Sequence, residues 1–469
     1  MFGYFRGLSF FDNRALRQVN DKLEPPKSNM AAYADCATQM PRLDVVYPHS
    51  PLQGAISTKS DMKEFDWPEL SKYPQYDEKF MQSLVSAELP KGGVPRYEPE
   101  VWIQRQRDIL SGCLQAHNPW AGVSRKISKQ LDRGLPITNA YCKMVEMCYV
   151  PEVAALLKRH CEDDVGLNPC GGGTPLKATF LAEAPALFPV AVAYYIGNRY
   201  PAFLKTGKFV YDGTTLPLEA GLSDQYQFIE RNKDKWTFMD HTSVADTRMM
   251  IEKLGRGSRD LVTGDIGKPI TTWESCERNL YREELGQFIS ACALLREGGV
   301  AIVKMFTAKD VATACILRTA IAIFDTVRVF KPRISRPNNL ETYWIMAGFK
   351  KILFDPLLDP LLDVLAAAKP DSRYPAFLPQ ACFPPAFEER LRRMLMGQHL
   401  RTLPFFRLGV ALYEEKRESM EEPYAIQVGE MRRLAPEYEP FVDEWIHSYG
   451  PHLMGETYYQ FFKIEATKK

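Results

Sequence analysis

Between residues 260 and 347, short apolar runs of strand type alternate with longer segments of helical periodicity. The strand-type runs cover 260–264, 300–303, 327–330 and 343–347. The stretch 284–296 carries Leu285, Phe288 and Ile289 on roughly one helical face, and 308–324 is a second candidate crossover helix. Strands that alternate with helices predict an α/β domain with a mostly parallel sheet, so this pattern limits the fold more than composition does.

Ionisable residues stand beside three of these runs. Asp265 follows 260–264, Lys304 follows 300–303 after a Gly-Gly turn, and Glu341 stands just before 343–347, while Lys143 lies upstream in NAYCKMVEM. The carboxyl ends of parallel strands border the crevice where α/β sheets bind ligands. We therefore expect Lys143, Asp265, Lys304 and Glu341 to meet in one active site.

Two lysines and two carboxylates suit the removal of a hydroxyl proton. A lysine acts as a general base only when its amine is neutral part of the time, so its pKa must fall from about 10.4. We expect Lys143 to lower the pKa of Lys304 as a neighbouring cation, and Asp265 and Glu341 to hold both ammonium groups in place. Taken singly, Lys143 also fits a solvated helix lysine, Asp265 a turn residue, and Lys304 or Glu341 a surface ion pair. The prediction therefore depends on the spacing of all four residues together.

The motifs around these residues resemble those of the FtsJ-like RNA 2′-O-methyltransferases, specifically the mRNA cap-1 branch. The segment NAYCKM around Lys143 resembles the family segment NRAAxKM, and a GDIG turn holds Asp265. The longest match is FKPRISRPNNLETY, residues 330–343, which resembles FKPxxSRPxNSERY. The resemblance covers roughly residues 115–350, and cap methyltransferases of large DNA viruses are the nearest relatives that it suggests.

The resemblance implies a Rossmann-like fold and a defined reaction. Such an enzyme transfers a methyl group from S-adenosylmethionine to the ribose 2′-hydroxyl of the first transcribed nucleotide of capped mRNA, here with Lys304 as general base. Two alternatives stay open. One is the same chemistry on rRNA or tRNA, because the four residues are shared across the superfamily. The other is a non-catalytic RNA-binding scaffold of a capping complex.

The resemblance also places a cofactor turn after an apolar run. The family form EAPGGF is matched by EAPALF, residues 183–188, in which Ala186 and Leu187 replace the two glycines. We expect both to be tolerated if Leu187 opens a helix, although this departure motivates the scaffold alternative. At the adenine end, residues 239–242 resemble a GDIT-like turn of the family, in which Asp240 would accept a hydrogen bond from the adenine amino group. The alternative is that Asp240 is a helix N-cap. The candidate cofactor-binding residues are Glu183, Ala184, Pro185, Ala186, Phe188, Asp240 and Asp265.

Basic residues near an aromatic ring form the candidate RNA site. The segment 118–133 is comparable with an NPYE segment of the family, and cations beside Trp120 suit phosphates and a stacked base. On spacing alone it also fits a solvated amphipathic helix. The resemblance places Arg336 beside the substrate nucleotide, with pairing to a local carboxylate as the alternative. The candidates are Arg125, Lys126, Lys129, Arg336 and Asn339.

The chain divides into three expected regions. Residues 1–95, rich in Pro, Tyr and charged residues, predict an extended arm. Residues 96–350 hold the methyltransferase domain, and residues 351–469 predict a mostly helical C-terminal region. A cap-binding surface, a dimer contact and a dock for another capping enzyme are open roles for these flanks.

Composition limits the partners. The net charge is +1, so RNA binding depends on a local basic patch, and the capped 5′ end of mRNA is the expected partner, with other capping or transcription proteins as further candidates. The ten cysteines form no CxxC or paired metal spacing, which predicts no metal site and reduced thiols. No apolar window reaches about 18 residues and no signal peptide is evident, so we expect no membrane segment and an intracellular, cytoplasmic location, in a host cell or virion if the protein is viral.

Overall fold

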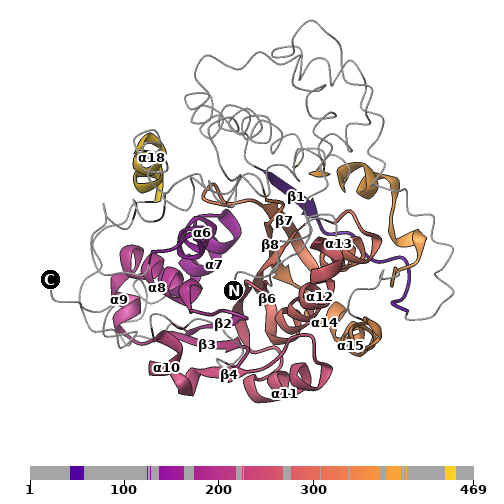
Figure 1. The fold of residues 1–469 in the computed structure, drawn as a ribbon, viewed down its shortest axis with the longest axis horizontal. Coiled ribbons are helices and arrows are strands. Elements are labelled where there is room, and N and C mark those ends of the chain that lie inside the picture. The colour runs from indigo at the N-terminus through magenta and orange to yellow at the C-terminus, as the bar shows by residue number, and fades with distance from the viewer. Residues whose placement is uncertain are drawn as a thin grey trace, which may run out of the picture. The chain divides into compact units, whose positions relative to one another are not determined.

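The computed structural model describes residues 43–57, 137–162, 174–217, 227–267, 276–306, 308–335, 339–369, 376–391 and 439–449, with the single positions 124, 127, 224, 394, 395 and 398. All of them belong to one compact unit. Its centre is an eight-stranded sheet with the order β1-β7-β8-β6-β5-β2-β3-β4 (Figure 1). The strands are β1 Asp44–Pro48, β2 Leu176–Leu181, β3 Phe209–Thr215, β4 Trp236–Phe238, β5 Arg259–Gly264, β6 Leu295–Met305, β7 Phe324–Phe330 and β8 Thr342–Phe349.

Five neighbouring strands, from β4 through β3, β2 and β5 to β6, run parallel. β8 lies between β6 and β7 and is antiparallel to both, and β1 is antiparallel to β7 at the edge. The chain moves outward from β2 to β4 on one side and then continues from β5 to β6 on the other. The carboxyl ends of β2 and β5 therefore form the switch point at which such sheets bind ligands. The prediction of a Rossmann-like, mostly parallel α/β sheet is confirmed.

Helices cover both faces of the sheet, with α6, α7 and α8 on one side and α12 and α13 on the other (Figure 1). All residues of α8 from 187 to 196 are buried, as are all but the first of α13, which is typical of helices packed between a sheet and further structure. The main helices are α6 Asn139–Cys148, α7 Pro151–Glu162, α8 Leu187–Arg199, α9 Pro201–Lys205, α10 Phe228–Arg231, α11 Val244–Leu254, α12 Cys276–Leu294, α13 Val311–Ile323, α14 Lys351–Phe354, α15 Leu358–Ala367 and α18 Glu439–Tyr449.

Two element boundaries differ most from the sequence-based expectation. The crossover helix expected at 284–296 begins at Cys276, because its first two turns are mostly polar and give little apolar periodicity. β6 begins at Leu295 rather than at 300, because Leu295 still pairs with Arg259 before the ladder shifts register. The intervening Gly298 has φ 72°, a left-handed conformation that glycine adopts without strain.

The flanking regions are described only in part. β1 falls within residues 1–95, and α14, α15 and α18 fall within residues 351–469. The three domain boundaries stay predictions, since much of both flanks lies outside the described residues. Among the described helices, none combines the length and apolar character needed to cross a membrane.

Gly286 tests how closely α12 packs on the turn after β4. A Cβ atom at this position would lie 1.9 Å from the backbone oxygen of His241, which cannot move without the turn. We predict that Gly286→Ala lowers the free energy of unfolding by roughly 1–3 kcal/mol through overpacking. Helix propensity alone favours alanine by about 1 kcal/mol. Urea unfolding measures the difference, and a raised midpoint would contradict the close approach.

Candidate active site

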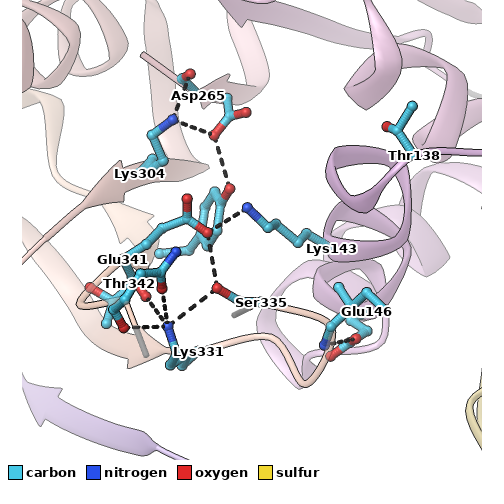
Figure 2. A network of polar contacts seen from close by, with 12 residues as sticks. Thr138, Lys143, Glu146, Asp265, Lys304, Lys331, Ser335, Glu341 and Thr342 are labelled. Atoms are coloured by element: carbon cyan, nitrogen blue, oxygen red, sulfur yellow. Dashed lines mark hydrogen bonds and ion pairs between the residues drawn. The ribbon is translucent and has the colours of Figure 1, made fainter. Parts of the chain in front are cut away.

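Four ionisable side chains from α6 and from three strand ends face one space (Figure 2). β5 and β6 end side by side in parallel register, which places Asp265 next to Lys304. β8 runs antiparallel to β6 with Tyr343 opposite Lys304, so Glu341, just before β8, returns to the same edge. Lys143 reaches this edge from α6, which begins after the N-cap Thr138. The structure thus brings together all four residues that the sequence singled out.

The four side chains form two ion pairs. Lys143 Nζ lies 2.5 Å from Glu341 Oε1, and Lys304 Nζ lies 3.1 Å from Asp265 Oδ1. Lys304 also donates to the backbone oxygen of Asp265, and the hydroxyl of Tyr343 donates to Asp265 Oδ1 over 2.9 Å. Each of the four charged side chains is 11–18% exposed. They are therefore largely desolvated but still reachable by a ligand.

The carboxylate of Glu341 is held in its ionised form. Burial alone raises its pKa, but the charges of Lys143, Lys304 and Lys331 outweigh burial and lower the pKa to about 2. Glu341 is therefore a permanent anion at neutral pH, and it keeps Lys143 in place through a charge-assisted hydrogen bond.

The pKa of Lys304 contradicts the sequence-based expectation. Burial lowers this pKa, but the charges of Asp265 and Glu341, with a further contribution from Glu183, raise it more, and the net shift is upward. The expected fall in the pKa of Lys304 is therefore wrong. The expectation underestimated the carboxylates, because Asp265 lies in contact with Lys304 and Glu341 adds a second negative charge nearby.

A tight turn joins β2 to α8 at the same edge of the sheet. Leu187 opens α8, and the preceding Ala186 has φ 71°, in the left-handed region. Glu183 Oε1 accepts hydrogen bonds of 3.0 Å from the backbone amides of Leu187 and Phe188, and so satisfies the first turn of the helix. Burial, and next the charge of Asp265, raise the pKa of Glu183 to about 8.

Residues 221–349 match the protein-family model described as FtsJ-like methyltransferase. This stretch runs from before β4 to the end of β8 and holds Asp265, Lys304 and Glu341. Over this stretch the chain is similar to FtsJ-like methyltransferases. That similarity implies a site for S-adenosylmethionine.

Relatives of this chain include proteins named for mRNA caps. A Drosophila melanogaster "Cap-specific mRNA (nucleoside-2′-O-)-methyltransferase 2" is 30% identical over 187 residues, 36% of this chain and 26% of that protein. A Trypanosoma brucei brucei "Cap-specific mRNA (nucleoside-2′-O-)-methyltransferase 1" is 41% identical over 64 residues, 14% of this chain and 17% of that protein. An uncharacterized Acanthamoeba polyphaga mimivirus protein is 25% identical over 259 residues, 52% of this chain and 30% of that protein. The chain thus spans less than a third of each relative.

The residues at the turn between β2 and α8 fit the cofactor that the similarity implies. Leu187 is only 2% exposed, so its side chain does not project from the turn in place of the family's glycine. The left-handed conformation of Ala186 costs an L-residue about 1–2 kcal/mol but leaves only a methyl group there. Asp265 and the exposed Asp240 add carboxylates at the ends of β5 and β4. Asp240 is not the N-cap of α11, since that position belongs to Ser243.

A buried lysine organises the chain that carries Glu341. Lys331 is 3% exposed, and its Nζ donates to Ser335 Oγ, to both oxygens of Asn339 and to the backbone oxygen of Glu341, over 2.6–3.2 Å (Figure 2). Ser335 Oγ in turn donates to Glu341 Oε1 over 3.0 Å. The sequence motif contained Lys331 and Ser335 but suggested no role for either. Asn339, a candidate RNA contact, binds Lys331 in the protein alone.

The remaining candidate RNA-binding residues lie outside the described part of the chain. They are Arg125, Lys126, Lys129 and Arg336. Their contact with RNA stays a prediction.

The low pKa of Glu341 predicts a pH dependence of stability. A carboxylate with a depressed pKa stabilises the fold above its unfolded value of about 4.3 and loses that contribution as the pH falls towards its folded value of about 2. We expect the free energy of unfolding of the wild-type protein to fall by roughly 2 kcal/mol more than that of Glu341→Gln between pH 5 and pH 3. Urea unfolding at each pH measures both, and parallel profiles would argue against the ion-paired state of Glu341.

Proposed function

We propose that this chain transfers a methyl group from S-adenosylmethionine to the 2′-hydroxyl of the first transcribed nucleotide of capped mRNA. The observation that most supports this reaction is the paired cluster of Lys143, Asp265, Lys304 and Glu341 at the carboxyl edge of a methyltransferase sheet. The FKPRISRP motif and the names of two relatives favour capped mRNA as the substrate. The chain covers only part of those relatives, so capped mRNA as the substrate is part of the proposal.

In the proposed reaction, the 2′-oxygen forms a bond to a methyl carbon while its proton leaves. When bound, S-adenosylmethionine would supply a methyl group made electrophilic by its sulfonium sulfur, and the bond between that sulfur and the methyl carbon would break to release the neutral thioether S-adenosylhomocysteine. Lys304 accepts the hydroxyl proton at Nζ, and Asp265 fixes the direction of that amine through the 3.1 Å contact. Tyr343 holds Asp265 in turn, so that the general base is oriented before substrate arrives.

Proton acceptance requires a change in the charge balance around Lys304. The pKa of this lysine is raised in the protein alone by Asp265 and Glu341 against the effect of burial. Exclusion of water by a bound ligand and the approach of another cation both lower a lysine pKa. We propose that ligand binding reverses the upward shift in this way, while Lys143 stays paired with Glu341 and keeps a second cation in the space.

The proposed ligand contacts follow the strand ends. The residues proposed to hold the cofactor around the switch point of the sheet are Glu183, Ala184, Pro185, Ala186, Phe188, Asp240 and Asp265. Those proposed to contact the transcript are Arg125, Lys126, Lys129, Arg336 and Asn339. Other capping or transcription proteins are further proposed partners.

Comparing two RNAs tests the substrate. We expect methyl transfer to a short m7G-capped RNA, at the 2′-hydroxyl of its first nucleotide, to be much faster than to the same RNA with a 5′-triphosphate. Tritium transfer from labelled S-adenosylmethionine measures both rates. Equal rates on both RNAs would favour an rRNA or tRNA substrate. Failure of S-adenosylmethionine to bind in a calorimetric titration would favour the non-catalytic scaffold, which the altered Ala186-Leu187 turn motivates.

Replacing Lys304 tests the general base. We predict that Lys304→Ala lowers kcat by about 10²–10⁴-fold, while the affinity for S-adenosylmethionine and RNA stays close to that of the wild type. Lys350→Ala is the matched control, because Lys350 is also ion-paired with an aspartate, Asp325, but follows the far end of β8. Appreciable turnover by Lys304→Ala would remove this lysine from the role.

The pH profile separates a base from a purely orienting group. If Lys304 is the base, the rising limb of kcat/KM reports its raised pKa in the free enzyme, and the limb of kcat reports the complex. We therefore expect the kcat limb to lie at lower pH than the kcat/KM limb. Two limbs at the same pH would contradict the proposed reversal of the shift.

A further inference from the structure

A buried carboxylate on α6 connects three parts of the chain. Glu146 is one helical turn after Lys143 and is 1% exposed. Its Oε2 accepts a 2.6 Å hydrogen bond from the backbone amide of Arg333, and its Oε1 accepts 2.9 Å bonds from the amide of Ile334 and from the indole nitrogen of Trp445. α6, the 331–335 segment and α18 are thus joined at one side chain.

These three donors are what make the buried carboxylate tolerable. Burial raises the pKa of Glu146, and the amides of Arg333 and Ile334 and the indole of Trp445 limit that rise. A buried acceptor that loses its donors is strongly unfavourable. The carboxylate therefore holds the 331–335 segment and α18 close to α6, and removing any one of the three donors loosens the position of the other two.

The C-terminal helix α18 contributes more than one contact. Trp445 is fully buried, and Glu444 Oε1 lies 2.6 Å from the Arg333 guanidinium. At the end of α18, the backbone oxygen of Tyr449 accepts a hydrogen bond from the hydroxyl of Tyr149, which follows α6. α18 therefore packs on α6 and on the 331–335 segment together.

The 331–335 segment leads directly to the proposed active site. Ser335 donates to the same carboxylate oxygen of Glu341 that binds Lys143, and Lys331 binds the backbone of Glu341 (Figure 2). Lys143 and Glu146 are mounted on one helix, so the Lys143–Glu341 pair is fixed from both sides. A shift of the segment relative to α6 would change this distance.

We propose that Glu146 is a positioning residue through which α18 sets the 331–335 segment, and that α18 is therefore needed for methyl transfer to RNA but not for cofactor binding. This rests on the proposed function. The cofactor turn is built from β2 and α8, whereas the Glu146 network holds the side of the site formed by Lys143 and Glu341.

Two single substitutions in the full chain test the proposal. Glu146→Gln replaces one acceptor oxygen by a donor, and Trp445→Phe removes the indole N–H while leaving a smaller aromatic ring at this buried position. We expect Glu146→Gln to lower kcat on m7G-capped RNA by about 10–100-fold, because a misplacement of catalytic groups by about 1 Å can cost on the order of 100-fold in rate, with the Kd for S-adenosylmethionine unchanged. Trp445→Phe should lower kcat less and add little on top of Glu146→Gln, because both act through one network.

Glu152→Gln is the matched control. Glu152 is a partly buried carboxylate on α7 that pairs with Arg328 of β7, so it also holds a helix to the sheet, but through a strand residue and without a hydrogen bond to the 331–335 segment among the described contacts. We expect this variant to lose stability and keep its kcat. An equal loss of kcat in Glu152→Gln would show that general loosening explains the effect, and would overturn the positioning role.

Hydrogen exchange gives a readout that does not need activity. We expect the amides of Arg333 and Ile334 to exchange faster in both Glu146→Gln and Trp445→Phe, while peptides from β5 and β6 keep their protection. If Glu146→Gln does not fold, Trp445→Phe decides. Unchanged exchange at 331–335, or unchanged kcat in a folded Glu146→Gln, would overturn the proposal. Wild-type protein that methylates no RNA would refute the proposed function, while the exchange data would still decide the coupling.

Discussion

The antiparallel insertion of β8 between β6 and β7 determines which side chains can meet at the carboxyl edge of the sheet. β7 runs in the direction of β6, so the segment after it emerges at this edge, and β8 starts where that segment ends. Because β8 has eight residues, the opposite strand direction would put its first residue about 25 Å away. Glu341 would then be unable to reach either lysine.

This convergence concentrates charge in a small desolvated space. Lys143, Lys304 and Lys331 act on Glu341, while Asp265 balances Lys304. Burial and the charge of Asp265 raise the pKa of Glu183 to about 8, which reduces its negative charge at neutral pH. Beside it, the cluster holds three lysines against the two carboxylates of Asp265 and Glu341. Such an excess accords with an anionic substrate, although the whole chain is almost neutral.

Much of the fold could be predicted from the sequence, because strand ends and crossover helices are encoded locally. The runs before Asp265 and Lys304 are apolar and short, and the rule that ligands bind at carboxyl ends places both residues at one edge. The direction of the Lys304 pKa shift could not be predicted, since it depends on distances to carboxylates. Glu146 could not be recognised either. In the sequence it looks like an ordinary helix glutamate, and its partner Trp445 stands 299 positions away.

The two outer strands of the sheet have a bearing on how the protein can associate with others. β1 has five residues and ends at Pro48, and β4 has only three. Each therefore presents a brief row of backbone donors and acceptors, and proline removes one donor altogether. Binding modes in which a partner peptide adds a strand to a sheet need a longer, regular edge strand. Binding of a partner protein to this domain would accordingly use the side chains of helices and turns, and not backbone hydrogen bonds to an edge strand.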